Sequence, residues 1–94
     1  MPHQVYMLLL ENDSIYVGAT EDVEKRYREH QAGTASKATR DSKPVRIIYT
    51  ESHHDRSSAV QRERQLKRWS RAKKLALAEG RLDDLKVLAK RRQP

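Results

Sequence analysis

The sequence contains no cysteine, so neither a disulfide nor a thiolate metal site can hold this chain together. Its longest apolar run is Val5 to Leu10. A membrane helix needs about 18 or more apolar residues, and a signal peptide needs about 7 behind a basic flank. We therefore expect a soluble, cytoplasmic protein that does not contact a membrane.

Aromatic residues are also scarce, at 5% of the chain, and the hydrophobic fraction (36%) barely exceeds the charged fraction (35%). A chain of 94 residues can bury only one lean core. We expect a single domain over residues 1–94. We expect its motifs to lie within residues 3–78 and residues 81–94 to form a C-terminal helix and a basic tail.

Positive charge is abundant, and it is unevenly distributed. The net charge is +7. Residues 1–55 hold seven Lys and Arg against nine Asp and Glu, whereas residues 56–94 hold thirteen against four. A basic surface attracts polyanions through counterion release, so nucleic acid is the expected partner. A solvated, solubilising surface or a ribosome-associated role is the alternative interpretation of the charge.

The pattern of apolar residues predicts an α/β fold with a small three-stranded antiparallel sheet flanked by helices. The run Val5–Leu10 reads as a central strand because it lacks polar alternation. The second strand is expected over 15–19 and the third over 45–50. Helices are expected from Thr20, as N-cap, to Gly33; from Asp55 or Ser57 to about Trp69; from Ser70 to Ala78; and around Leu82, Leu85 and Leu88. Residues 33–44 read as a long polar loop.

The hairpin between the first two strands decides where its tyrosines point. A two-residue loop at Asn12 and Asp13 would place Tyr6 opposite Ala19, with Tyr16 on the other face. An odd loop or a bulge would bring both phenols to one face. A site that uses both tyrosines requires the second arrangement.

Single residues allow ordinary structural readings. Tyr6 and Tyr16 could be half-buried strand aromatics, and Arg26 and His30 a helix-edge cation and a core histidine. Glu63 lies within an apolar helix stripe, where a carboxylate needs an ion pair, hydrogen bonds or a metal; Arg40 and Lys67 are possible ion-pair partners. Trp69 reads as core packing, and the polar pair His53–His54 reads as loop.

Four motifs occur together in one order. They are Gln4-Val5-Tyr6, Tyr16-Val17-Gly18, the helix segment from Glu24 to His30, and Gln61 to Lys67 followed by Ser70 to Lys74. On these residues the chain resembles the GIY-YIG nuclease superfamily, most closely its short stand-alone bacterial members, and is similar to the N-terminal catalytic domain of excinuclease C. Gln4 replaces the first motif's glycine and Val17 an isoleucine.

The resemblance implies an endonuclease that hydrolyses phosphodiester bonds with Mg²⁺ or Mn²⁺, and Glu63 would be the one protein ligand of that ion. It implies that Tyr6 acts as general base, Tyr16 orients water or phosphate, Arg26 holds the scissile phosphate, and His30 hydrogen-bonds a tyrosine or relays a proton. Flanking contacts to nucleic acid would come from Gly18, Lys37, Arg40 and Lys67.

The substrate expected from the resemblance is DNA rather than RNA, cut with structure selectivity or weak sequence specificity in repair or recombination. A protein partner could supply the targeting. Two alternatives stay open: a non-catalytic nucleic-acid-binding module on the same scaffold, and a protein-interaction module that presents the C-terminal helices.

Overall fold

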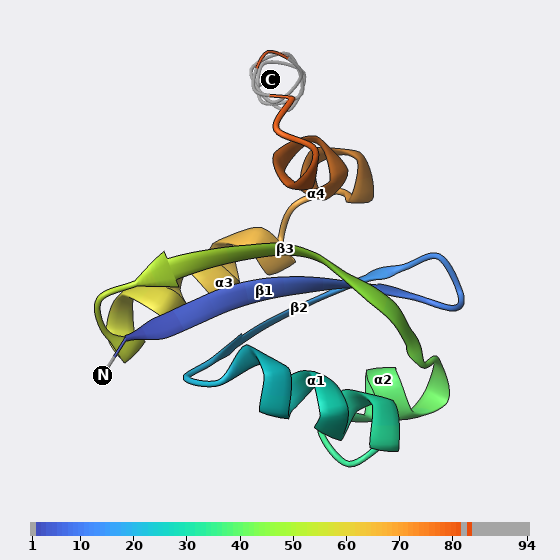
Figure 1. Cartoon of the computed structure of the whole chain (residues 1–94). Coiled ribbons are helices and arrows are strands. Elements are labelled where there is room, and N and C mark those ends of the chain that lie inside the picture. The colour runs from blue at the N-terminus through green and yellow to red at the C-terminus, as the bar shows by residue number, and fades with distance from the viewer. Residues whose placement is uncertain (1, 82, 84–94) are drawn as a thin grey trace.

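Three strands form one antiparallel sheet at the centre of the computed structural model, which describes residues 2–81 and 83. The strands are β1 (His3–Leu10), β2 (Ile15–Thr20) and β3 (Pro44–His53), and β1 lies between the other two (Figure 1). Four successive residues of β1, Val5 to Leu8, are buried, because both faces of the sheet are covered. The predicted three-stranded antiparallel sheet with a central first strand is confirmed.

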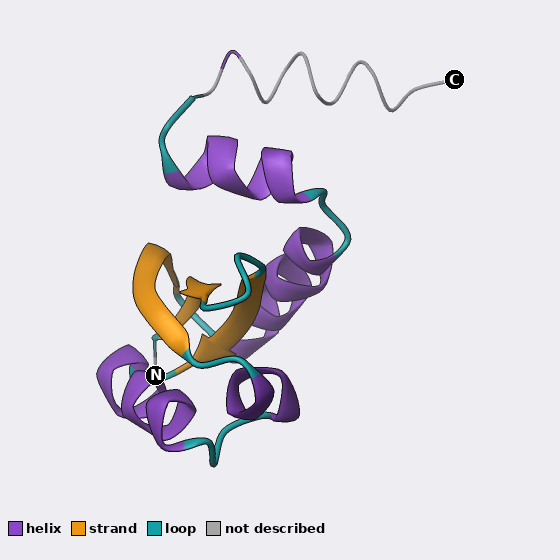
Figure 2. Ribbon diagram, turned by 90° about the vertical axis from the view of Figure 1, so that its right-hand side faces the viewer, coloured by secondary structure: helices purple, strands orange, loops and turns teal. Residues whose placement is uncertain are grey.

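Helices cover both faces of this sheet. Helix α1 (Val23–Ala32) and the short α2 (Lys37–Asp41) lie on one side, α3 (Arg56–Lys67) lies on the other, and α4 (Arg71–Ala78) follows α3 (Figures 1 and 2). None of the described helices is long and apolar enough to cross a bilayer. The core consequently has two parts. Val5, Met7 and Val17 pack with Ala59 and Leu66 of α3, while Tyr6, Leu8 and Leu10 pack with Tyr16, Val23, Tyr27 and Ile47.

The hairpin has the odd loop that a two-tyrosine site requires. Tyr6 pairs with Gly18 and Leu8 pairs with Tyr16, so the loop contains the three residues Glu11–Asp13. Asp13 has a φ of 69°, which is the left-handed conformation that closes three-residue hairpins. Tyr6 and Leu8 share a face, so Tyr16 lies on the same face as Tyr6.

Helix α1 begins two residues later than predicted, because β2 continues through Thr20. Asp22 is the N-cap, and its carboxylate accepts a hydrogen bond from the backbone of Lys25 at 3.0 Å. The Thr20 hydroxyl instead accepts from the backbone of Asp22 at 3.2 Å. The predicted stop at Gly33 is confirmed, with a φ of 80°.

The expected polar loop over 33–44 was wrong in part, because it contains α2. Ser36 caps this helix by accepting from the backbone of Thr39 at 3.2 Å. Five residues without apolar periodicity give no helical signal. Helix α3 ends at Lys67, and the predicted Ser70 cap of α4 is confirmed. The predicted last helix around Leu82, Leu85 and Leu88 lies outside the described residues.

A polar cluster joins β3 to α3. The Glu51 carboxylate accepts hydrogen bonds from Tyr49 at 2.6 Å, from His53 at 2.7 Å and from Arg62 at 3.0 Å. Burial, reinforced by the bond to Glu51, raises the pKa of Tyr49 to about 12, so its hydroxyl remains a donor. The cluster fixes α3 against the sheet and places His53 within it, whereas the side chain of His54 contacts Asp55 at 3.1 Å.

Trp69 follows α3 and packs, half-buried, against the core cluster beneath that helix. Cations also cover its ring, since Lys73 lies 4.2 Å from the ring centroid and Arg62 lies 5.3 Å from it. The prediction that Trp69 continues the apolar stripe is confirmed.

Candidate active site

Three aromatic side chains meet on the α1 face of the sheet. The Tyr6 hydroxyl lies 2.7 Å from Nε2 of His30. The Tyr16 ring lies 4.8 Å from the His30 ring and 6.3 Å from the Tyr6 ring, measured between centroids. Tyr6 is 2% exposed and His30 is fully buried. The structure therefore brings three of the five predicted catalytic residues together, with one direct hydrogen bond between them.

Gly18 makes room for the Tyr6 phenol. The two residues are paired across β1 and β2, and a Cβ at position 18 would overlap the Tyr6 hydroxyl and lie 2.5 Å from its Cζ. The phenol consequently lies across β2, an edge strand of the sheet. Gly18 is itself buried, so the structure gives this glycine a steric function inside the site.

We predict that Gly18→Ala destabilises the protein by about 1–3 kcal/mol, because an added methyl group must displace a packed ring. Thermal unfolding measures this loss, and Gly80→Ala is the matched control. A Cβ at Gly80 meets nothing within 4 Å, so that variant carries only the cost of its φ of 71°, about 1 kcal/mol. A Gly18→Ala variant that is as stable as the wild type would contradict the steric function of Gly18.

Burial shifts the protonation of the tyrosine–histidine pair. It raises the pKa of Tyr6, with a contribution in the same direction from Tyr16, and the lowering effect of the Arg26 guanidinium does not reverse this. Burial also lowers the pKa of His30, helped by Arg26. At neutral pH the pair is therefore a neutral phenol and a neutral imidazole. Tyr6 would need nearby positive charge to form a tyrosinate that could act as general base. In the resting state of the protein, Tyr6 is therefore not a tyrosinate.

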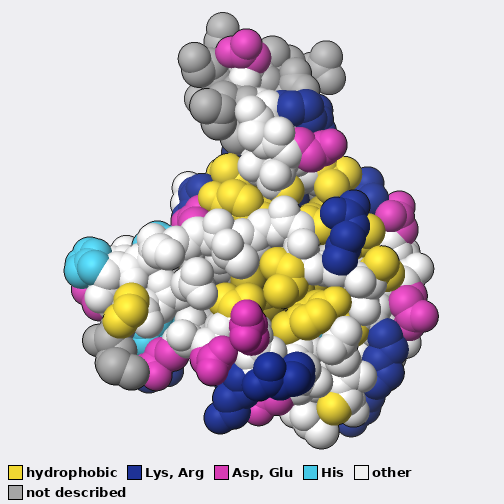
Figure 3. Space-filling model, viewed as in Figure 1, with side chains coloured by type: hydrophobic (Ala, Val, Ile, Leu, Met, Phe, Trp, Pro, Cys, Tyr) yellow, Lys and Arg dark blue, Asp and Glu magenta, His cyan; other side chains and the backbone are white. Residues whose placement is uncertain are grey.

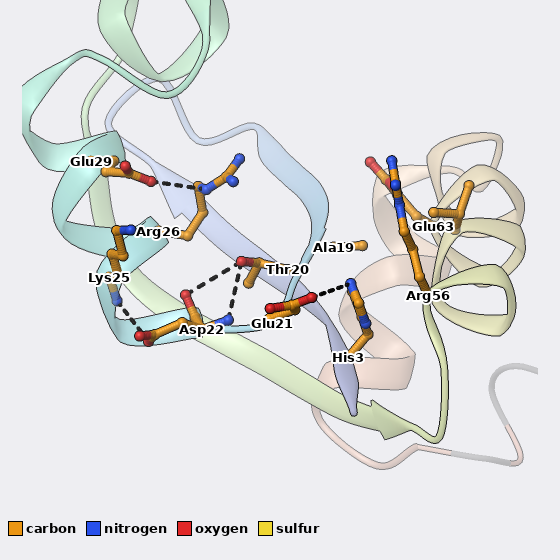
Figure 4. Close-up of a pocket in the computed structure, with 11 residues that line it drawn as sticks. His3, Ala19, Thr20, Glu21, Asp22, Lys25, Arg26, Glu29, Arg56 and Glu63 are labelled. Carbon is orange, nitrogen blue, oxygen red and sulfur yellow. Dashed lines mark hydrogen bonds and ion pairs between the residues drawn. The ribbon is translucent and has the colours of Figure 1, made fainter. Parts of the chain in front are cut away.

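A cleft of about 480 Å³ opens at the β2 edge, between α1 and α3. Arg26 and Glu29 line one wall, and Arg56 and Glu63 project from α3 on the opposite wall (Figure 4). The backbone between these walls includes Ala19, which follows Gly18 on β2. Residues from opposite faces of the sheet thus meet at its edge, and Arg26 and Glu63, far apart in sequence, share one cavity.

Both charged site residues have partners. Arg26 Nε lies 3.0 Å from Glu29, with both side chains about two-fifths exposed. Glu63 is less exposed, at 19%, and its Oε2 lies 2.9 Å from Nζ of Lys67. Of the two partners that the sequence suggested for Glu63, the structure contains the pair with Lys67.

The carboxylate of Glu63 suits a hydrated Mg²⁺ or Mn²⁺ ion. Within the part of the chain that the structure describes, it does not belong to a site in which several protein ligands enclose the metal. Among the described residues there is no group of three or more His, Asp or Glu side chains placed to hold an ion. Magnesium keeps several water ligands and is commonly held by one or two carboxylates. Lys67 contacts Oε2 of Glu63, and Glu29 supplies a second carboxylate in the same cleft.

The cations of the cleft differ from those that the sequence suggested. Lys37 and Arg40 are exposed on α2 and do not line it, whereas Lys25 and Arg56 do. Within the described chain, no carboxylate lies within ion-pairing distance of Arg56. On the face in Figure 3, basic and acidic side chains lie beside one another rather than in one basic patch.

Sequence reasoning also missed Thr39, which is fully buried on α2 and lies 2.7 Å from Nδ1 of His30. Its position in an apparent polar loop gave no signal of burial. Arg56 was missed because the first turn of an amphipathic helix is usually solvent-exposed. The available signal was its spacing: Arg56 precedes Val60 by four residues and Glu63 by seven, so the three side chains lie on one face of the helix.

Comparisons with known proteins identify the family of this chain. The family model described as the GIY-YIG catalytic domain matches residues 2–76. A UPF0213 protein of Haloquadratum walsbyi is 43% identical over 81 residues, covering 86% of this chain and 91% of the relative. A UPF0213 protein of Staphylococcus haemolyticus is 38% identical over 79 residues, covering 84% of this chain and 96% of the relative.

A solved structure shares the fold. The solution NMR structure of a UPF0213 protein from Bacillus halodurans matches with a TM-score of 0.54 and 35% identity, and it covers 84% of each chain. The short stand-alone relatives carry no more specific name than UPF0213. The chain belongs to the GIY-YIG family of the nuclease superfamily, and within it to the UPF0213 proteins.

Proposed function

We propose that this protein is a metal-dependent endonuclease that hydrolyses phosphodiester bonds in DNA, with structure selectivity or weak sequence specificity, in DNA repair or recombination. One observation carries the proposal: Arg26 and Glu63 line the same cleft at the sheet edge, and the charges of both act on Tyr6, which is hydrogen-bonded to His30. Phosphodiester hydrolysis needs a cation on the phosphate oxygens, an activated water and a route for the water's proton. These residue types supply all three.

Arg26 would hold the scissile phosphate through a two-pronged, charge-assisted contact. In the protein without nucleic acid, Arg26 pairs with Glu29. Exposed ion pairs of this kind contribute about 0–1 kcal/mol, so a phosphate can displace Glu29 from Arg26 at low cost. The pair keeps the guanidinium at the cleft until substrate arrives.

Glu63 would hold Mg²⁺ or Mn²⁺. The ion, when bound, would neutralise phosphate charge and lower the pKa of the attacking water. For this, Lys67 must share or release the carboxylate that it contacts at 2.9 Å. Lys67 is half exposed, so it can turn toward a flanking phosphate instead.

Tyr6 would take the proton of the attacking water while it passes its own proton to Nε2 of His30. This relay suits the resting state of the pair, in which burial keeps the phenol protonated and the imidazole neutral. Tyr16, whose ring lies 4.8 Å from that of His30, would orient the water or the phosphate.

Flanking phosphates would bind to cations around this centre. Lys25 and Arg56 line the cleft itself, while Lys37 and Arg40 on α2 would contact more distant phosphates.

We predict that Arg56→Ala weakens binding of a DNA duplex about threefold to tenfold and lowers the slope of log affinity against log salt by about one, as for the loss of one phosphate contact. Fluorescence anisotropy at several salt concentrations measures both quantities. Arg64→Ala is the matched control, because Arg64 is an exposed arginine of the same helix that lines a separate hollow beside Trp69. If the two variants weaken binding equally, Arg56 has no special position in the cleft.

A substrate panel tests the proposed function. Labelled duplex, nicked, branched and single-stranded DNA, with matching RNA, are incubated with the protein in Mg²⁺, in Mn²⁺ and in EDTA. We expect metal-dependent cleavage of at least one DNA. Salt-dependent binding without cleavage would identify a binding module, and neither binding nor cleavage would favour a protein-interaction module.

A further inference from the structure

A buried chain of hydrogen bonds continues beyond the tyrosine–histidine pair to α2. His30 is fully buried, and its two ring nitrogens have different partners: Nε2 lies 2.7 Å from the Tyr6 hydroxyl, and Nδ1 lies 2.7 Å from Oγ1 of Thr39. Thr39 is fully buried as well. Three elements, β1, α1 and α2, thus contribute one side chain each to this buried chain.

The partners of Thr39 allow its oxygen to accept from His30. The Thr39 hydroxyl can donate to the backbone carbonyl of Ser36 at 3.4 Å or to its Oγ at 2.9 Å. Its own proton therefore has an acceptor away from the imidazole. A threonine hydroxyl has one proton and two lone pairs, so the oxygen remains available to Nδ1–H.

The hydrogen bond at the other end of the chain fits the same direction. Among the described residues, the hydrogen-bond partner of the Tyr6 hydroxyl is Nε2 of His30. If Nε2 carried the imidazole proton, the described residues would offer the phenol no acceptor for its own proton. With the proton on Nδ1, every hydroxyl and ring nitrogen in the chain is satisfied.

We infer that Thr39 is the positioning residue of the tyrosine–histidine pair: it accepts the Nδ1 proton of His30 and so presents an unprotonated Nε2 to Tyr6. A neutral imidazole has one donor and one acceptor nitrogen, and the partner of one nitrogen determines the role of the other. Threonine at this position, rather than an apolar residue of equal size, then fixes the tautomer.

The consequence for the reaction rests on the proposed function. As Tyr6 receives the water's proton, its own O–H bond breaks and an N–H bond forms at Nε2, which leaves His30 as an imidazolium with both nitrogens protonated. That transfer is impossible if Nε2 already carries the proton. The charged groups around the imidazolium are Arg26, which disfavours it, and Glu29, which favours it, and the Tyr16 ring meets the His30 ring edge-on.

Thr39→Val and Thr39→Ser separate this role from packing and from the capping of α2. Valine keeps the size of threonine and loses the hydroxyl, whereas serine keeps the hydroxyl. The direct readout is the ¹⁵N NMR spectrum of the His30 ring, which reports the tautomer without any substrate. The other three histidines, at positions 3, 53 and 54, are assigned by single substitution.

We expect the Nδ1–H tautomer in the wild type and in Thr39→Ser, and a mixed or reversed population in Thr39→Val. An Nε2–H tautomer in the wild type overturns the inference without any variant, and so does an unchanged tautomer in a folded Thr39→Val. These results hold whether or not the protein cleaves DNA, so they are independent of the nuclease proposal.

Once a DNA that the protein cleaves is identified, Thr39→Val should lower kcat about tenfold to a hundredfold with little change in KM. The reason is that the substitution affects the proton acceptor and not substrate binding. Thr39→Ser should restore kcat. If Thr39→Val has the reversed tautomer but the wild-type kcat, Thr39 sets the tautomer of the resting protein and has no part in the reaction.

Discussion

Replacing Glu63 with alanine should abolish Mg²⁺-dependent cleavage, with a loss in rate on the order of a hundredfold or more. Glu63 is the one acidic residue of α3, and the described residues offer no three-ligand cluster that could hold the ion in its place. The fold should persist, because the side chain faces the cleft and not the core formed by Ala59 and Leu66. Single-turnover cleavage across a Mg²⁺ titration, with circular dichroism and thermal unfolding, measures both expectations.

Two further variants isolate the charge of Glu63 from its shape. Glu63→Gln keeps the shape and should be as inactive as alanine. Lys67→Ala removes the ion-pair partner at 2.9 Å and leaves the carboxylate free, so cleavage with protein in excess should persist and should require less Mg²⁺. If Glu63→Ala cleaved DNA at the wild-type rate, Glu63 would not be the ligand of the metal ion.

Arg26→Ala should slow cleavage about a hundredfold to a thousandfold while it weakens DNA binding less than tenfold. The reason is that the phosphate charge it holds increases in the transition state, whereas ground-state affinity is shared among many cations. Arg26→Lys keeps the charge but loses the two-pronged geometry, so its rate should fall between those of wild type and alanine. Single-turnover rates and anisotropy Kd values on the same DNA give the comparison.

Arg28 provides the control for Arg26, because it is an exposed arginine of the same helix that does not line the cleft. Arg28→Ala should leave the cleavage rate unchanged and should affect binding slightly. If Arg26→Ala lost cleavage and binding by the same factor, Arg26 would be a docking residue and would have no separate part in the transition state.

The sequence predicted the central strand and the C-terminal end of the first helix well, because both depend on local chemistry. The unbroken apolar run Val5–Leu10 gives β1, and Gly33 adopts the positive φ that ends α1. The hairpin loop could not be decided in this way. The polar segment Glu11–Ser14 is compatible with both loop lengths, and only the observed register, with Asp13 at a φ of 69°, places Tyr6 and Tyr16 on one face.

The composition of the site was predictable only in part. Motif spacing indicated Arg26 and Glu63, but not that helices on opposite faces of the sheet would bring them to one cleft at the edge of β2. Arg56 and Thr39 were missed because their significance comes from tertiary contacts. Short α2 has no periodic signal, and its one fully buried side chain is the partner of His30.

The sheet edge gives this small domain an accessible site without a large cavity. Gly18 lets the Tyr6 phenol cross the edge strand, and Ala19 and Thr20, which follow on β2, form part of the cleft. A polar cluster around Glu51 holds α3, and with it Glu63, against the sheet. The geometry of the site therefore depends on contacts on both faces of the sheet.

Whether this protein is a metal-dependent nuclease is measured by cleavage of end-labelled branched and duplex DNA by the wild-type protein, titrated with Mg²⁺ and then treated with EDTA. Parallel anisotropy measurements establish that the DNA is bound. We expect discrete cleavage products that appear with Mg²⁺ and cease to form in EDTA. Saturated binding with no cleavage at any Mg²⁺ or Mn²⁺ concentration would contradict the proposed nuclease function.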